Sequence, residues 1–179
     1  DVDRATAVDN LRRILDVAER HGFFVRIDME NSPYTETTLE IWETVWGLGQ
    51  KSVGVVLQSA LRRSESDAAR VSAQSGRIRL VKGAYKEPRT LAFQSKAEVD
   101  AAFVRLMRLL LRDGVYPAIA THDPAMIEAT TRFADELGLD KGRFEFQMLY
   151  GVRRDLQTRL TRDGYRVRVY IPFGREWFP

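Results

Sequence analysis

Hydrophobic residues recur along the chain in two alternating patterns, one with the spacing of a helix and one typical of a strand. Apolar residues three or four positions apart predict six helices, for example a long one over 96–112 and a short one over 153–162. Short apolar or β-branched runs predict six strands at 23–28, 53–58, 77–82, 117–121, about 144–148 and 167–171. Strands separated from one another by helices indicate an α/β protein with a parallel sheet.

Capping residues help to place the ends of these helices. Asp123 followed by Pro124 is a strong helix start, because it combines a capping side chain with a proline in the first turn. Thr35 or Thr37 is predicted to cap the second helix. A glycine, Gly22, is predicted to end the first helix.

Alternation alone fits both an open doubly wound sheet and a closed barrel. All six predicted strands carry polar side chains at or near their carboxyl ends, namely Asp28, Gln58, Lys82, Thr121, His122, Gln147 and Tyr170. A barrel gathers all such ends into one site, whereas an open sheet gathers only those beside its switch point. The pattern therefore favours a (βα)8 TIM-type barrel, of which this chain supplies about six βα units.

The segment from Arg79 to Tyr85 carries the most chemical information. A β-branched strand with two cations, Arg79 and Lys82, breaks at Gly83 and then presents an aromatic ring. An unpaired guanidinium inside a strand is costly, so Arg79 needs an anionic or strongly accepting partner. Asp28, two strands away, is one such partner, and a flavin whose reduced ring carries negative charge is another.

The other polar strand ends have structural as well as functional interpretations. Asp28 either positions a substrate or meets solvent at a strand end, and Gln58 either satisfies a backbone group or faces a heterocycle. Thr121 and His122 precede a helix N-terminus, where they add donors for a phosphate or flavin, or simply end a strand. Tyr85 and Tyr170 either contact a substrate or pack at the surface.

Composition narrows the chemistry. The 179 residues contain no cysteine and only two histidines, which argues against disulfides, thiolate chemistry and a His-rich metal site, so no metal site is predicted. A redox function would therefore need an organic cofactor. No apolar run is long enough to span a bilayer. The basic stretch 141–179 is interpreted first as a solvated face and second as a contact for an anionic membrane; nucleic-acid binding is not expected.

Taken together, six segments resemble the proline dehydrogenase family in order and spacing. They are Arg26-Ile27-Asp28-Met29-Glu30, Val56-Leu57-Gln58, Arg79 to Tyr85, Ala120-Thr121-His122, Phe144-Glu145-Phe146-Gln147 and Tyr170-x-Pro-x-Gly-x-x-Trp177. The resemblance covers essentially the whole chain and is stronger to the single-activity bacterial enzymes. It implies that residues 1–179 form one incomplete FAD-binding barrel domain.

The resemblance also implies roles for individual residues. Asp28 and Arg79 match active-site residues, and Tyr85 and Tyr170 match aromatics that enclose the substrate. The expected FAD contacts are Met29, Gln58, Arg79, Lys82, Gly83, Ala84, Thr121, His122 and Gln147. The implied reaction is hydride transfer from C5 of L-proline to flavin N5, giving Δ1-pyrroline-5-carboxylate, with electrons passed to a membrane quinone. The residues do not identify a catalytic base.

Two features of the family have no match in this sequence. One is a strand lysine that meets the substrate carboxylate, expected before Asp1, and the other is an Arg-Arg pair on a helix expected after Pro179. This piece alone is therefore expected to be inactive or nearly so, and to associate through its open strand edges, with a homo-oligomer as one outcome. The expected location is cytoplasmic, with peripheral contact at the inner face of the membrane. The alternatives are a methylenetetrahydrofolate-reductase-like flavin barrel and a non-catalytic barrel fragment.

Overall fold

The computed structural model describes residues 3–174, which form six parallel strands alternating with six helices. The strands are β1 Val25–Ile27, β2 Val53–Gln58, β3 Arg77–Val81, β4 Ala118–Ala120, β5 Glu145–Leu149 and β6 Arg166–Tyr170. The helices are α1 Arg4–Arg20, α2 Ser32–Gly47, α3 Ser64–Ala73, α4 Lys96–Asp113, α5 Pro124–Glu136 and α6 Arg154–Arg162. Each strand is hydrogen-bonded to the next in chain order, so all six carboxyl ends lie along one edge of the sheet.

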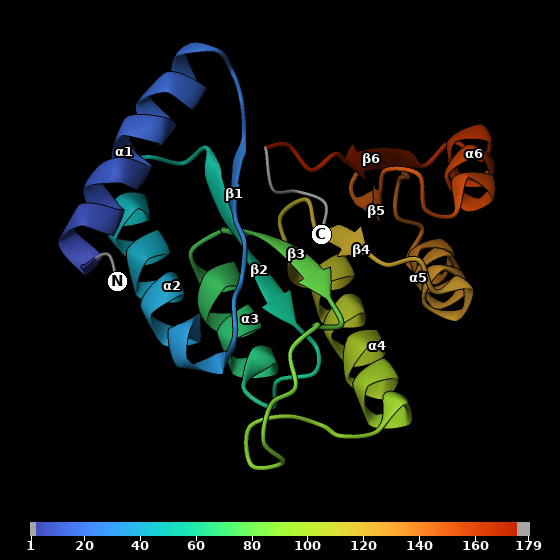
Figure 1. The fold of residues 1–179 in the computed structure, drawn as a ribbon. Helices are drawn as coiled ribbons and strands as arrows, with labels where there is room; N and C mark the ends of the chain where they lie inside the picture. The colour runs from blue at the N-terminus through green and yellow to red at the C-terminus, as the bar shows by residue number, and fades with distance from the viewer. Residues whose placement is uncertain (1–2, 175–179) are drawn as a thin grey trace.

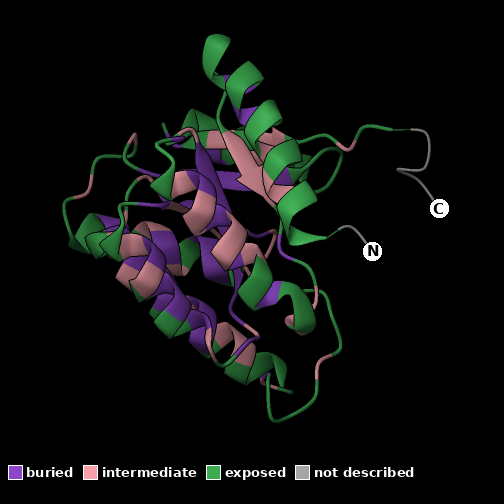
Figure 2. Cartoon of the chain, turned by 90° about the vertical axis from the view of Figure 1, so that its left-hand side faces the viewer, coloured by how far each residue is buried: buried purple, intermediate pink, exposed green. Residues whose placement is uncertain are grey.

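The sheet curls into a half-barrel of the TIM type, with β1 and β6 at its two edges within residues 3–174. Figure 1 shows the helices around the outside of the strands, α1 and α2 at one side and α5 and α6 at the other. The core lies between this outer layer and the sheet, where Trp42, Phe103 and Phe146 are fully buried (Figure 2). The predicted barrel architecture is thus confirmed.

Several predicted helix ends are confirmed by their capping contacts. The Asp123 carboxylate accepts a hydrogen bond from the Ala125 N–H at the start of α5, and Pro124 occupies the first turn. A capping box of Ser95 and Glu98 begins α4. Of the helices in residues 3–174, none is both long and apolar enough to cross a membrane.

The predicted start of α2 is wrong. Neither Thr35 nor Thr37 is the cap, because α2 already begins at Ser32, and the Asn31 side chain at the N-cap position makes no capping bond. Instead, both carboxylate oxygens of Glu87, from the loop after β3, accept hydrogen bonds from the N–H and Oγ of Ser32 at 2.6 Å. A cap supplied from a distant loop leaves no local pattern in the sequence.

Strand boundaries also differ from the prediction. Strands β1 and β4 span only three residues each, and β6 lies one residue earlier than predicted. In β5 the polar residues Glu145 and Gln147 are buried, as are their apolar neighbours. Both faces of β5 are covered, because one contacts the barrel interior and the other contacts the outer helices.

A substitution at Gly54 in β2 tests how closely the barrel interior is packed. A Cβ at this position would lie 2.4 Å from the Arg77 carbonyl oxygen and 2.6 Å from Nη1 of Arg26. We expect Gly54→Ala to lower the free energy of unfolding by about 2 kcal/mol, because neither neighbour can move without losing a hydrogen bond. The matched control is Gly47→Ala, where a Cβ meets nothing within 4 Å. Urea unfolding of both variants checks this, and equal midpoints would contradict it.

Candidate active site at the carboxyl ends of the strands

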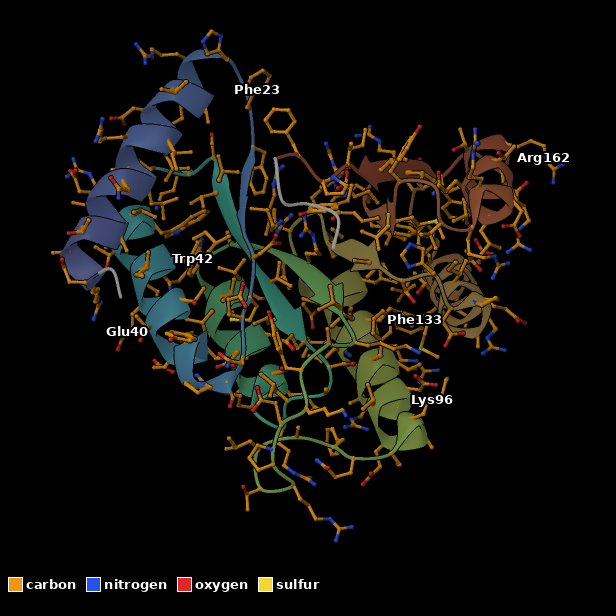
Figure 3. All side chains as sticks on the ribbon, viewed as in Figure 1. Phe23, Glu40, Trp42, Lys96, Phe133 and Arg162 are labelled. Atoms are coloured by element: carbon orange, nitrogen blue, oxygen red, sulfur yellow. The ribbon has the colours of Figure 1, made fainter. Side chains whose placement is uncertain are left out.

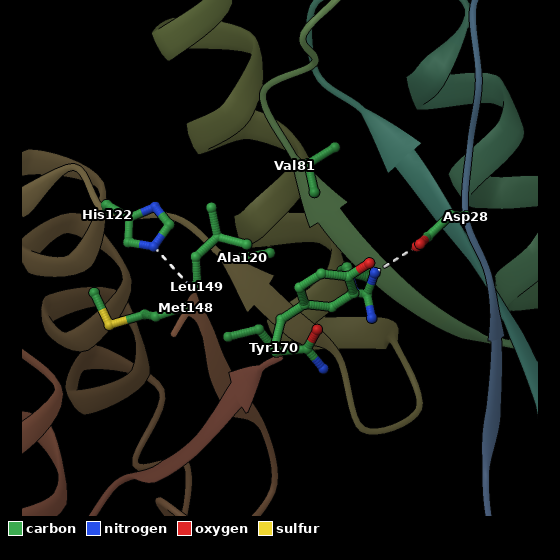
Figure 4. A pocket seen from close by; sticks show the side chains of 9 residues that line it. Asp28, Val81, Ala120, His122, Met148, Leu149 and Tyr170 are labelled. Carbon is green, nitrogen blue, oxygen red and sulfur yellow. Dashed lines mark hydrogen bonds and ion pairs between the residues drawn. The ribbon is translucent and has the colours of Figure 1, made fainter. Parts of the chain in front are cut away.

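Two adjoining cavities of about 250 and 620 Å³ lie at the carboxyl ends of the strands. They share Asp28, Arg79 and His122 in their linings, so they form one continuous site, part of which Figure 4 shows. Every residue predicted for the site lines one or both cavities: Asp28, Met29, Gln58, Arg79, Lys82, Gly83, Ala84, Tyr85, Thr121, His122, Gln147 and Tyr170. The structure therefore gathers in one place all the residues that were selected from separate strands.

Arg79 lies at the centre of the site and is paired as predicted. Its Nη1 lies 2.6 Å from Oδ1 of Asp28, which reaches across β2 from the end of β1 (Figure 4). The Arg79 side chain is 15% exposed and that of Asp28 is 57% exposed. The positive charge of the largely buried guanidinium is therefore neutralised by a carboxylate that remains in contact with solvent. The Nε of Arg79 is buried and has no hydrogen-bond partner among the described residues.

Lys82 is held by two carboxylates. Its Nζ contacts Asp100 of α4 and lies 2.6 Å from Oδ2 of Asp123, the cap of α5. Lys96, at the N-terminal end of α4 (Figure 3), contacts the same two acids. The hydrogen bond from Lys82 is the main reason that the pKa of Asp123 falls to about 2. An ammonium group has three donors, so Lys82 keeps one for a ligand while two hold it in place.

Hydrogen bonds fix the segment Thr121-His122 and determine which of its side-chain protons remain free to be donated to a ligand. The Leu149 N–H donates to His122 Nε2 at 2.8 Å, and burial, followed by the charge of Arg153, lowers the pKa of the ring. His122 is therefore neutral at pH 7 and carries its proton on Nδ1. Thr121 is buried, and its Oγ1 accepts the Asp123 N–H at 3.1 Å, so its hydroxyl proton remains to be donated.

The backbone at Gly83 offers a close approach for a ligand. Gly83 has a φ of +108°, and a Cβ there would lie 2.7 Å from Oε1 of Gln58. The Gln58 side chain donates to the Glu30 carbonyl at 2.8 Å, which confirms the structural interpretation of this glutamine and still leaves its Oε1 at the cavity wall. Gln147 similarly donates to Oε1 of Glu145.

The two predicted aromatic side chains stand at the rim of the site. Tyr85, after β3, and Tyr170, at the end of β6, are each a little over two-fifths exposed and line the cavities. Met29 lies beneath the rim and is buried. Trp177, which completes the last of the matching segments, lies outside the described residues.

Three acidic contacts around the site were missed in the sequence. Asp100 of α4 binds Lys82, Glu30 accepts a hydrogen bond from the Tyr85 hydroxyl, and Glu87 caps α2. Asp100 follows Lys96 by four positions, a spacing that places the two side chains on the same face of a helix and weakly indicates an ion pair between them. The other two contacts join residues 55 positions apart and had no local signal.

The comparison with known families decides the identity. The sequence model of the family "Proline dehydrogenase" matches residues 3–176 of the chain. The chain belongs to the proline dehydrogenase family. This membership excludes the methylenetetrahydrofolate-reductase-like alternative, which rested on the shared barrel and cofactor alone.

Curated proline dehydrogenases from bacteria are among its relatives. The chain is 48% identical over 170 residues to "Proline dehydrogenase" from Deinococcus radiodurans, covering 94% of the chain and 55% of that protein. It is 41% identical to "Proline dehydrogenase 2" from Bacillus subtilis, covering 99% of the chain and 58% of that protein. The chain thus spans a little over half the length of these relatives. The similarity to single-activity bacterial proteins agrees with the sequence prediction.

Solved structures show the same fold. The crystal structure of proline utilization A (PutA) from Bdellovibrio bacteriovorus inactivated by N-propargylglycine superposes with a TM-score of 0.91 at 29% identity. The match covers 97% of this chain and 20% of that one. The half-barrel is therefore the arrangement found in a much larger member of the family.

The Asp123 ion pairs predict a pH dependence. The pKa of Asp123 is about 2 in the folded protein and 3.8 ordinarily, so this group stabilises the fold above pH 3.8 and the gain is lost as pH falls from 3.8 towards 2. We expect Asp123→Asn, which keeps the helix cap, to be about 1 kcal/mol less stable than the parent at pH 6 and nearly equal to it at pH 2. Urea unfolding across this range measures the difference, and a constant gap would contradict the assignment.

Proposed function

We propose that this chain forms the flavin-facing wall of an FAD-dependent proline dehydrogenase. In the proposed reaction L-proline is oxidised to Δ1-pyrroline-5-carboxylate by hydride transfer from C5, and the electrons pass on to a quinone. The observation that supports it most strongly is the convergence of Arg79, Lys82 and the Gly83 backbone on one cavity. Membership of the family supports the substrate.

The donors at the site fit a flavin. The Arg79 guanidinium, the neutral His122 and the Thr121 hydroxyl line the cavity and can donate hydrogen bonds, as an electron-rich heterocycle requires. The absence of a Cβ at Gly83 leaves its backbone open to a flat ring or a ribityl chain. Met29, Gln58, Lys82, Ala84 and Gln147 would complete the binding surface. Bound there, FAD supplies the hydride acceptor at its N5 atom.

The residues of the chain then have defined tasks. Arg79 keeps a fixed positive charge where negative charge grows during hydride transfer, and Asp28 sets the orientation of its guanidinium. Because this pair is already formed in the structure, little reorganisation is needed at the moment of reaction. Lys82, fixed by Asp100 and Asp123, presents its remaining donor to an anionic part of the ligand.

Two tyrosines would enclose the substrate. Tyr85, in the loop after β3, lines one cavity and Tyr170, at the end of β6, lines the other, and each presents a largely apolar and partly exposed ring. Rings in these positions would cover the proline ring and reduce the access of water to the reacting carbon. Neutral His122, whose Nε2 accepts the Leu149 N–H, carries its proton on Nδ1, which makes it a hydrogen-bond donor to the ligand.

Anaerobic reduction by proline tests this function. In an enzyme that contains this chain together with the family's carboxylate-binding lysine and Arg-Arg pair, we expect the bound flavin to lose its visible absorbance when L-proline is added, and Arg79→Met to slow this bleaching by about 100-fold. The matched control is Arg105→Met, which removes an arginine that pairs with Glu65 on the outer helices. A flavin that proline does not reduce would refute the proposed reaction. Absence of bound flavin would favour the non-catalytic fragment.

A further inference from the structure

The loop that carries Tyr85 is anchored in two different ways. Its far part is fixed to the turn after β2 by backbone bonds, including Phe93 N–H to the Ala60 carbonyl and Arg62 N–H to the Leu91 carbonyl, both at 2.9 Å. Its near part, residues 83–87, has no backbone bond to another element within the described structure. What holds the near part is a pair of side-chain contacts, each made with a carboxylate.

The first contact is made by Glu87. Its carboxylate accepts hydrogen bonds from the N–H and Oγ of Ser32, the first residue of α2, and the Glu87 side chain is half-buried there. Because Asn31 supplies no capping bond, the positive end of α2 is available to a negative group from elsewhere. Glu87 makes a further contact through its backbone, because Gln94 Nε2 donates a hydrogen bond to the Glu87 carbonyl at 3.2 Å.

The second contact is made by Glu30. The Tyr85 hydroxyl donates to its carboxylate, and this hydrogen bond is the main cause of a raised pKa for Tyr85. The backbone of Glu30 is itself fixed, because its carbonyl accepts the hydrogen bond from Gln58 at the cavity wall. Glu30 and Ser32 belong to the same short connection between β1 and α2. Both contacts therefore attach the near part of the Tyr85 loop to one rigid point.

We propose that Glu30 and Glu87 are positioning residues that hold the Tyr85 ring in place at the rim of the cavity, where it would enclose the substrate. Glu87 sets the path of the loop, and Glu30 sets the direction of the ring. Neither residue takes part in the chemistry, because both act through Tyr85. This inference rests on the proposed function, in which Tyr85 encloses the substrate.

The kinetic test uses four single variants of the same flavin-bound enzyme, which contains this chain together with the carboxylate-binding residues of the family. Loss of either anchor lets the ring move away from the substrate, so we expect Glu30→Ala and Glu87→Ala each to raise the KM for L-proline about fivefold and to change kcat less than about twofold. The matched control is Glu40→Ala on α2, whose side chain pairs with Arg4 far from the cavity. Tyr85→Phe removes the hydroxyl that Glu30 binds, and it should raise the KM to the same extent as Glu30→Ala.

Coupling separates positioning from a general structural effect. On the Tyr85→Phe background, Glu30→Ala should change the KM by less than about 1.5-fold, because the hydrogen bond has already been removed. A full fivefold effect on that background would overturn the assignment of Glu30. Because Glu30 is exposed, this variant also serves if Glu87→Ala does not fold.

A second readout does not depend on turnover. Hydrogen–deuterium exchange of the Ser32 amide, without substrate, should become faster in Glu87→Ala, because this variant removes the acceptor of that N–H, and remain unchanged in Glu40→Ala. If proline does not reduce the flavin of the parent protein, the proposed function fails while this exchange still tests the anchors. Unchanged exchange in Glu87→Ala overturns the anchoring by Glu87. Faster exchange with an unchanged KM overturns the positioning role.

Discussion

The ion pair between Arg79 and Asp28 is the interaction on which the site depends. A guanidinium within a sheet cannot be left without compensation, and Asp28 provides it across β2 from the end of β1. The pair works only if β1, β2 and β3 are adjacent, parallel and in the observed register, in which Val56 lies opposite Arg79. One ion pair therefore links the strand order of the barrel to the position of the Arg79 charge at the carboxyl ends of the strands.

Further cations lie below Arg79 in the barrel interior, and they are stabilised differently. Arg26 donates to the carbonyls of Val55 and Arg77, and its guanidinium lies 5.0 Å from the centre of the Phe24 ring. Burial, and then the charge of Arg79, lowers the pKa of Arg26 to about 9. On the other side, Glu145 is paired with Arg168. Carbonyls and an aromatic face therefore compensate Arg26, Glu145 compensates Arg168, and Asp28 remains available to Arg79.

Lys82 shows how the surrounding helices contribute to the same site. Its two partners, Asp100 and Asp123, come from α4 and from the N-cap of α5, so one strand end is fixed to two helices of the outer layer. Asp123 combines this role with capping its own helix. Such dual use makes the geometry of the cavity depend on the packing of the outer layer, and not on the loops alone.

The sequence was sufficient for much of this description, and the reason is physical. The strand order and the barrel follow from the spacing of hydrophobic residues and from the alternation of strands with helices, both of which can be read from the sequence. The Arg79–Asp28 pair follows from the free-energy cost of burying an unpaired cation. The anchors of the Tyr85 loop could not be found in this way, because Glu87 and Ser32 meet only after the chain has folded. Strand boundaries were also missed, since short strands such as β1 end where pairing ends and not where the apolar pattern ends.

The central claim is that Arg79 provides the positive charge for a reduced flavin, and the midpoint potential of the bound flavin tests it most directly. Removal of the charge in Arg79→Met should make the two-electron potential more negative by about 30 mV or more, because the anionic reduced ring loses its stabilising partner. Arg77→Met, which removes a cation two positions earlier on the same strand, should shift the potential far less. Equal potentials in the parent and Arg79→Met would contradict the account.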